Sequence, residues 1–118
     1  MKTLINLITK EIHGETGYHR FGGIEFRYKK KEIAHMHSNG LLDIYFPQRI
    51  SGLLIDQCWC GRHHVYPASG WTSFYLKSDT DLNRCIQLIR WSMQLKTGIK
   101  TIVSVEGEIH QLKGMYEK

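Results

Sequence analysis

The sequence lacks the features of a membrane-spanning protein and of a disulfide-stabilised secreted domain. Its wholly apolar runs are a few residues long, far below the roughly 20 residues that a bilayer-spanning helix needs. Its three cysteines, an odd number, provide no disulfide framework, and Cys58 and Cys60 are too close for an unstrained bond. The N-terminal segment has too short an apolar part for a signal peptide. We therefore expect a cytoplasmic protein with reduced thiols and no membrane span.

The sequence also lacks the motifs of several enzyme classes. Ser69-Gly70 has no nucleophile-elbow frame, and Gly22-Gly23 is too short for a phosphate-binding loop. No two cysteines have the two-residue spacing of zinc sites, and the His-Glu-x-x-His motif is missing. We therefore expect no metal ion or organic cofactor, and no metal requirement for folding.

The chain has the size and composition of one folded domain. It contains 118 residues, of which 42% are hydrophobic, and this is enough for a single modest core. It shows no internal repeat, low-complexity segment or linker. We expect one domain over residues 1–98, with residues 99–118 as a C-terminal extension of the same domain.

Positive charge is concentrated in one short segment. The net charge is +5, and the densest basic cluster consists of Arg27, Lys29, Lys30 and Lys31. A basic surface attracts nucleic acid, although such runs are more often solvated turns between strands. A solvated turn is the preferred interpretation, and nucleic-acid binding is the alternative.

Two periodicities predict an α+β fold. Apolar residues at helical spacing predict helices over residues 3–13, 47–58 and 79–96. Alternating residues predict strands over residues 24–28, 31–37, 41–46 and 70–77, with a further short strand at 101–105. Asn39-Gly40 is expected to supply a turn with positive φ angles. The layout predicts an antiparallel sheet of four or more strands, with the N- and C-terminal helices on one face, in the order α-β-β-β-α-β-α.

The histidines carry the main functional signal. His35 and His37 are two residues apart on a predicted strand, so they should share one face, together with Ile33. Imidazoles exchange protons near neutral pH, and Asp43 on the next strand could orient one of them. The candidate catalytic residues are His35, His37, Asp43 and His64. A metal site built on the same histidines is a further alternative.

Aromatic residues near these histidines could supply the walls of a pocket. On the predicted strand 70–77, Trp71, Ser73 and Tyr75 should point to one face and Thr72, Phe74 and Leu76 to the other. A pocket of this kind suits a planar aromatic or lipid-like ligand, whereas Trp71 or Phe74 taken alone is more simply a core residue. The candidate ligand-binding residues are Arg20, Phe26, His63, Ser69, Trp71 and Phe74.

Taken together, the motifs resemble the luciferase-like domain family. They are Arg-Phe-Gly-Gly-x-Glu-Phe, Glu-Ile-x-His-x-His, Gly-Leu-x-Asp-x-x-Phe-Pro and His-His-x-x-Pro-x-Ser-Gly-Trp-x-Ser-Phe. In this chain they occupy residues 20–26, 32–37, 40–47 and 63–74, and a final helix follows. The resemblance covers about residues 4–96, and the Cys58-Trp59-Cys60 segment falls outside the family pattern.

The resemblance implies a function only in outline. The fungal luciferases that name the family oxidise a hydroxylated pyrone with molecular oxygen, without a metal or organic cofactor. The resemblance therefore implies a small aromatic or lipid-like ligand and oxygen-dependent oxidation for this chain. It leaves enzymatic activity and oligomeric state open. The order of elements is also similar to that of the YjbR-like family, which has a frataxin-like fold and has been proposed to bind DNA through paired wings.

Overall fold

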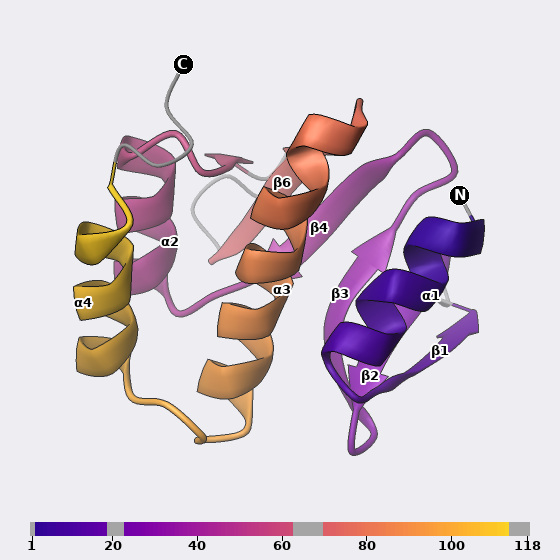
Figure 1. Cartoon of the computed structure of the whole chain (residues 1–118). Helices are drawn as coiled ribbons and strands as arrows, with labels where there is room; N and C mark the ends of the chain where they lie inside the picture. The colour runs from indigo at the N-terminus through magenta and orange to yellow at the C-terminus, as the bar shows by residue number, and fades with distance from the viewer. Residues whose placement is uncertain (1, 19–22, 63–69, 114–118) are drawn as a thin grey trace.

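The computed structural model describes residues 2–18, 23–62 and 70–113 (Figure 1). Its helices are α1 (Lys2–Glu11), α2 (Gln48–Asp56), the short 3-10 helix η1 (Asp79–Asp81), α3 (Leu82–Lys96) and α4 (Ile102–Gln111). Its strands are β1 (Glu15–Tyr18), β2 (Ile24–Tyr28), β3 (Lys31–Met36), β4 (Leu41–Tyr45), β5 (Gly61–Arg62) and β6 (Trp71–Tyr75). The predicted α+β class is confirmed.

The strands form one antiparallel sheet in the order β1-β2-β3-β4-β6-β5. In Figure 1, α1 and α3 lie across the near face of this sheet, α1 over β2 and β3 and α3 over β4 and β6, as the sequence predicted. The core lies between them. Its sheet side is built from Phe26, Ala34, Met36, Leu42, Ile44 and Phe74, and its helix side includes Ile8, Ile12, Cys85, Leu88 and Ile89.

Helices α2 and α4 extend the core beyond the sheet (Figure 1). The rings of Trp59, which follows α2, and Trp91 of α3 meet edge to face with centroids 5.0 Å apart. Val105 and Ile109, four residues apart on α4, are fully buried in the same cluster. The proposed division at residue 98 stays a prediction.

Strand β3 contains a β-bulge that decides which side chains face the helices. Phe26 pairs with Ala34 but Arg27 pairs with Glu32, so Ile33 is an extra residue on β3. Ile33 is fully buried in the core, whereas His35 lies on the opposite face beside Asp43. The prediction that Ile33 shares a face with His35 was therefore wrong, because simple alternation does not continue through a bulge.

Two edge strands, residues 101–105 and the turn before β4 differ from the prediction. β1 and β5 are short edge strands, with four and two residues, and their sequences carry no clear alternation. Residues 101–105 begin a helix and not a strand, because the Thr101 side chain accepts a hydrogen bond from the Ser104 N–H and caps α4. In the turn before β4, Gly40 alone has a positive φ, and the Asn39 side chain accepts a hydrogen bond from the Leu41 N–H.

None of the helices among the described residues combines the length and the apolar character needed to cross a membrane. The longest of them, α3, has 15 residues.

Candidate functional site

A row of polar residues crosses the face of the sheet that is turned away from α1 and α3. In the strand register, Glu25 lies opposite His35, His35 opposite Asp43, and Asp43 opposite Ser73. Residues in one such row project from the same face. Glycines end the row on both edge strands, Gly17 on β1 and Gly61 on β5.

Asp43 is the centre of this row. Its Oδ2 lies 2.9 Å from Nε2 of His35 and 2.8 Å from Nε2 of His37, and its Oδ1 accepts a hydrogen bond from the Ser73 hydroxyl at 3.3 Å. Only 1% of Asp43 is exposed. A carboxylate this deeply buried needs such partners, because burying a neutral polar group without them costs about 2–7 kcal/mol, and burying a charged group costs more. We call His35, His37 and Asp43 the His–Asp cluster.

A second carboxylate contacts His35 from the other side. Oε2 of Glu32 lies 2.7 Å from Nδ1 of His35, and the bulge at Ile33 allows these residues, three apart, to share a face. Burial lowers the pKa of His35, but the hydrogen bonds to Asp43 and Glu32 together outweigh burial and raise the pKa to about 9. The two carboxylates thus stabilise a positive charge on His35.

Aromatic rings lie beside the cluster. The Trp71 ring lies 5.2 Å from the His35 ring, and Tyr45, directly across the ladder from Trp71, places its ring 5.5 Å from the Trp71 ring. The Lys96 ammonium lies 5.2 Å from the centre of the Tyr45 ring. Burial lowers the pKa of Lys96, against the opposing influence of Glu32.

Gly70 fixes the start of β6 and so the position of Trp71. Its φ is +89°, and a Cβ at this position would lie 2.6 Å from the Phe46 carbonyl oxygen. The Gly70 carbonyl in turn accepts the Phe46 N–H at 3.1 Å. The positive φ and the close approach of the Phe46 backbone therefore require glycine at position 70.

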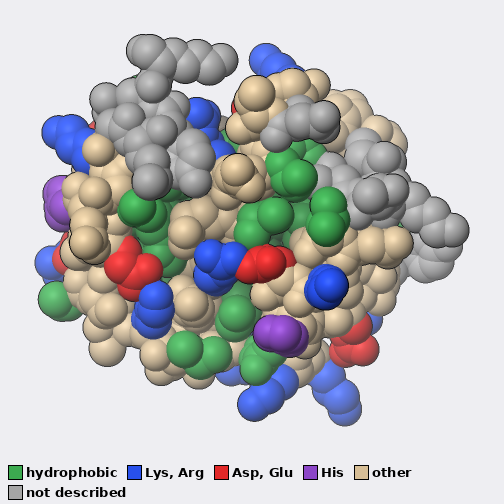
Figure 2. Space-filling view, viewed as in Figure 1, with side chains coloured by type: hydrophobic (Ala, Val, Ile, Leu, Met, Phe, Trp, Pro, Cys, Tyr) green, Lys and Arg blue, Asp and Glu red, His purple; other side chains and the backbone are tan. Residues whose placement is uncertain are grey.

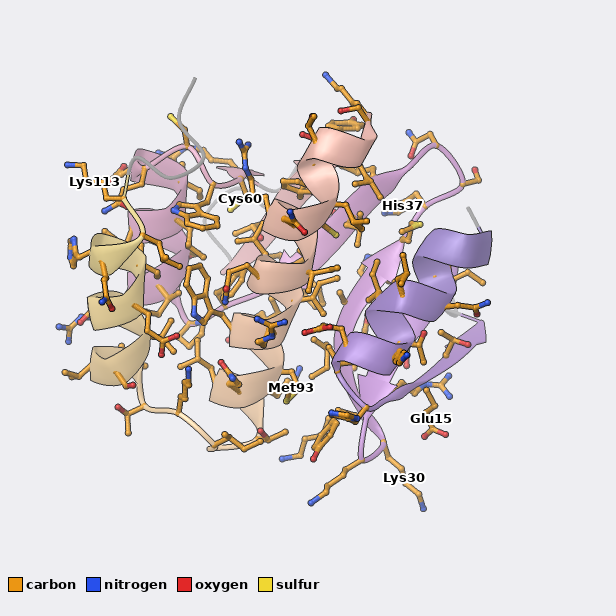
Figure 3. All side chains as sticks on the ribbon, in the orientation of Figure 1. Glu15, Lys30, His37, Cys60, Met93 and Lys113 are labelled. Atoms are coloured by element: carbon orange, nitrogen blue, oxygen red, sulfur yellow. The ribbon has the colours of Figure 1, made fainter. Side chains whose placement is uncertain are left out.

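A cavity of about 440 Å³ lies between β5, β6 and the start of α3. Its lining includes Cys58, Cys60, Ser73, Lys77 and Arg84, and Ser73 connects it to Asp43 through the hydroxyl hydrogen bond. Burial raises the pKa of Cys60 to about 12, against the hydrogen bond from Thr72. Cys60, labelled in Figure 3, is therefore a thiol at neutral pH and a poor nucleophile.

The structure brings together some of the predicted site residues and separates others. His35, His37, Asp43 and Trp71 meet on one face of the sheet. Phe26 and Phe74 instead lie in the core on the opposite face, at 0% and 5% exposure, because they pair with Ala34 and Leu42 in the ladder. Their placement as lining residues beside the histidines is thereby corrected. The predicted site residues Arg20, His63, His64 and Ser69 lie outside the described residues.

The basic segment lies at the other end of β3. Lys29 and Lys30 form the two-residue turn between β2 and β3, with φ angles of 49° and 69°, and Lys31 begins β3. Figure 3 shows Lys30 at the tip of this hairpin and His37 beyond the far end of β3. Arg27 does not join the lysines, because its Nε donates to Glu25 at 2.6 Å and its guanidinium lies over Gly17.

On the helix-covered side, charges of both signs are mixed. Figure 2 shows Lys and Arg side chains dispersed among acidic, apolar and backbone surface on this side of the molecule. One ion pair on this side joins Glu11 of α1 to Arg90 of α3.

Several site residues escaped the sequence analysis. Glu32 was hidden by the bulge, since simple alternation places it on the face opposite His35. The alternation placed Ser73 on the face of Trp71 but did not indicate its contact with Asp43. Tyr45 could have been found in the same way, because it lies two residues from Asp43. Lys96 lies at the end of α3, and no local pattern connects it to the sheet.

A family model described as the luciferase domain matches residues 30–92 of the chain. This range contains the His–Asp cluster together with Glu32, Tyr45, Trp71 and Ser73. No curated protein and no solved structure matches the chain.

Proposed function

The chain belongs to the luciferase-domain family, and from this premise we propose that it binds a small hydroxylated aromatic compound at the His–Asp cluster and presents it for oxidation by molecular oxygen. One observation carries the proposal. A hydrogen-bonded group of two imidazoles and two carboxylates, centred on the buried Asp43, lies directly against the Trp71 ring.

The composition of the site suits a flat ligand with a polar edge. Trp71 and Tyr45 offer aromatic surface for a ring, and aromatic contacts of this kind favour stacked or edge-to-face geometry. The His–Asp cluster offers polar atoms for a hydroxyl group on that ring. The His37 side chain is 34% exposed, so a ligand can reach the cluster from this side.

The chemistry follows from the same groups. A hydroxyl that donates a hydrogen bond to a carboxylate-rich cluster carries more electron density on its oxygen, and the attached ring gives up electrons more readily. In the proposed step, molecular oxygen is the oxidant and the ring is the electron donor. A ring carbon beside the hydroxyl-bearing carbon bonds to oxygen, the hydroxyl becomes a carbonyl, and its proton passes to the reduced oxygen as a hydroperoxide, so no further redox partner is needed. The resemblance to fungal luciferases supports this choice of oxidant.

Calorimetry with a hydroxylated pyrone tests binding, and an oxygen electrode tests turnover. We expect saturable binding by the unmodified chain, weakened at least 10-fold by Trp71→Ala. Tyr75→Ala is the matched control, because Tyr75 is a half-exposed aromatic residue on the same strand that lines the 440 Å³ cavity. If Tyr75→Ala abolished binding and Trp71→Ala did not, the ligand site would be the cavity and the proposal would be wrong.

Nucleic-acid binding is the second candidate, and the exposed hairpin tip of Lys29 and Lys30 favours it. The basic surface at this tip is small, because Arg27 is hydrogen-bonded to Glu25 and does not join the lysines. Binding through the tip would be electrostatic, no tighter than about 10⁻⁶ M at physiological salt, and would weaken steeply between about 50 and 200 mM salt. Fluorescence anisotropy with the Lys29→Glu, Lys30→Glu, Lys31→Glu variant tests this. A tight, sequence-selective complex at physiological salt would make this candidate the preferred one.

A further inference from the structure

The His–Asp cluster brings three metal-ligating atoms to one point. Asp43 Oδ2 lies 2.9 Å from His35 Nε2 and 2.8 Å from His37 Nε2, and all three atoms lie within 4.8 Å of one another. Metal–ligand bonds of about 2.0–2.1 Å at right angles separate neighbouring ligand atoms by about 2.9 Å, whereas a tetrahedral site separates them by about 3.4 Å. The two Asp43–imidazole separations therefore fit neighbouring positions of a six-coordinate site, and the two imidazole nitrogens lie no more than 4.8 Å apart.

We infer that His35, His37 and Asp43 bind a divalent first-row transition metal ion, with Fe(II) the best match. Two imidazoles and one carboxylate with open positions form the ligand set of non-haem Fe(II) sites. The three remaining positions of the ion are left for water or for an exogenous oxygen ligand. The family match assigns no ion here. From the sequence, a metal site on the two histidines is only an alternative, because Asp43 joins them only in the folded sheet.

The local charge favours a cation at this point. Glu32 and Asp43 place two carboxylates around one partly buried imidazole. Without an ion, His35 donates from both ring nitrogens and His37 donates from Nε2, and Asp43 Oδ2 accepts both Nε2–H groups. An ion at this point takes the place of those two Nε2 protons. A divalent ion compensates both carboxylates and lets the two imidazoles bind through lone pairs.

The surrounding residues already hold the ligands in place. When an ion displaces the Nε2 proton of His35, the Nδ1–H still donates to Glu32 Oε2 at 2.7 Å and directs the Nε2 lone pair toward the ion. The Ser73 hydroxyl donates to Asp43 Oδ1 and leaves Oδ2 as the ligand atom. Glu32 and Ser73 are thus positioning residues, and the bulge at Ile33 is what places Glu32 beside His35.

The ion would lie next to the aromatic ring of the proposed ligand site. Trp71 contacts His35, so an open coordination position near His35 can take the hydroxyl oxygen of a bound aromatic compound. The inference shares its residues with the proposed function and relies on it only for the role of the ion. Metal binding itself needs no organic ligand and is measured without one.

Calorimetry on chelator-treated, tag-free protein tests the inference, using Fe(II) without oxygen and Co(II) as a spectroscopic substitute. We expect one equivalent of either ion to bind, and the Co(II) complex to show the weak visible absorption of six-coordinate geometry. The chelator-treated protein should stay folded, and saturating Co(II) should raise its melting temperature. Strong absorption typical of tetrahedral Co(II) would contradict the assigned geometry.

Three variants assign the site. His37→Ala, at the partly exposed end of β3, should weaken Co(II) binding at least 100-fold while the melting temperature of the chelator-treated protein changes little. Glu32→Gln should weaken it by about 10–100-fold through loss of positioning alone. His110→Ala removes an exposed histidine on α4 and should leave Co(II) binding unchanged.

The outcomes separate this inference from the proposed function. Absence of Co(II) and Fe(II) binding, or binding that His37→Ala does not weaken, would overturn the inference. Pyrone binding by the chelator-treated protein without any Co(II) binding would leave the proposed function standing alone. Co(II) binding at the cluster without pyrone binding would contradict the proposed function and uphold the metal site.

Discussion

The two faces of the sheet bury different kinds of side chain, although both are built from neighbouring residues of the same strands. One face buries apolar side chains, and the other buries a charged one. On the face under α1 and α3, Leu42 and Ile44 are fully buried among apolar side chains, which stabilises the fold by removing apolar surface from water. On the other face, Asp43 lies between them in sequence and is nearly as buried, at 1% exposure, yet its charge disfavours burial.

The comparison indicates which face is kept for function. A buried carboxylate with two imidazoles is weak support for stability, since apolar residues of similar volume often serve a fold as well or better. Groups whose pKa values are strongly shifted within such clusters are also typical of functional sites. The helix-covered face therefore supplies most of the stability, and the polar row is where we propose that the chemistry takes place.

Substitution on the helix-covered face should give the largest loss of stability. Leu42→Ala should lower the free energy of unfolding by about 2–5 kcal/mol, because it removes a fully buried side chain and leaves a cavity. Urea denaturation measures the change. Folded Leu42→Ala protein should still bind Co(II) normally, and a loss of metal binding in that folded fraction would show that the two faces are not separable.

Substitution at the centre of the polar row should reverse this pattern. Asp43→Asn keeps the volume and removes the charge, and it should cost about 1–3 kcal/mol of stability through imperfect hydrogen bonding to the histidines. Binding of both Co(II) and the hydroxylated pyrone should fall below detection. Urea denaturation measures the change in stability, and calorimetry on the same preparation measures binding. Retained binding of Co(II) and the pyrone would contradict the assignment of binding to the polar row.

Substitution at the basic hairpin tip should change stability less than the two substitutions in the sheet. Lys29 and Lys30 both have positive φ angles, a conformation that Asn and Gly adopt at lower cost in a two-residue hairpin turn. The double change Lys29→Asn, Lys30→Gly should raise the free energy of unfolding by about 1 kcal/mol. Thermal denaturation measures the shift, and a destabilised variant would show that the lysine side chains support the turn.

The smallest expected effect concerns a carboxylate on the helix side. Burial raises the pKa of Glu108, but hydrogen bonds from Lys100 and Trp91, with the Lys100 charge, outweigh burial and lower the pKa below 4.5. The lowered pKa in the folded state means that Glu108 contributes stability above pH 4.5, and this contribution is lost as the pH falls through the folded value.

Melting temperatures measured from neutral to acidic pH check this, with Glu108→Gln as the comparison. The difference between the unmodified chain and the variant should shrink as the pH falls below 4.5 and through the folded pKa of Glu108, because both side chains are uncharged below that pKa. A difference that grows in acid would contradict the assigned direction.

Residue alternation predicted most of the fold and part of the site. It correctly placed Ser73 and Trp71 opposite Phe74 on β6, and it predicted that His35 and His37 project together. These inferences hold because adjacent residues of a regular strand point to opposite faces, which is a local property.

The remaining features depend on contacts that a local pattern does not contain. The bulge at Ile33 moved Glu32 to the side of His35, and it is visible only in the pairing of β3 with β2. Thr101 and the β-branched residues after it suggested a strand, but burial of Val105 and Ile109 against the core selected a helix. Strand pairing decided the register at the first place, and tertiary packing overrode local strand propensity at the second.

Nuclear magnetic resonance of the imidazole side chains tests most directly the claim that the polar row is the binding face. The account predicts that a hydroxylated pyrone shifts the ring signals of His35 and His37 and leaves those of His13 and His110, which lie on other surfaces, unchanged. Saturable pyrone binding that leaves the His35 and His37 signals in place would contradict it.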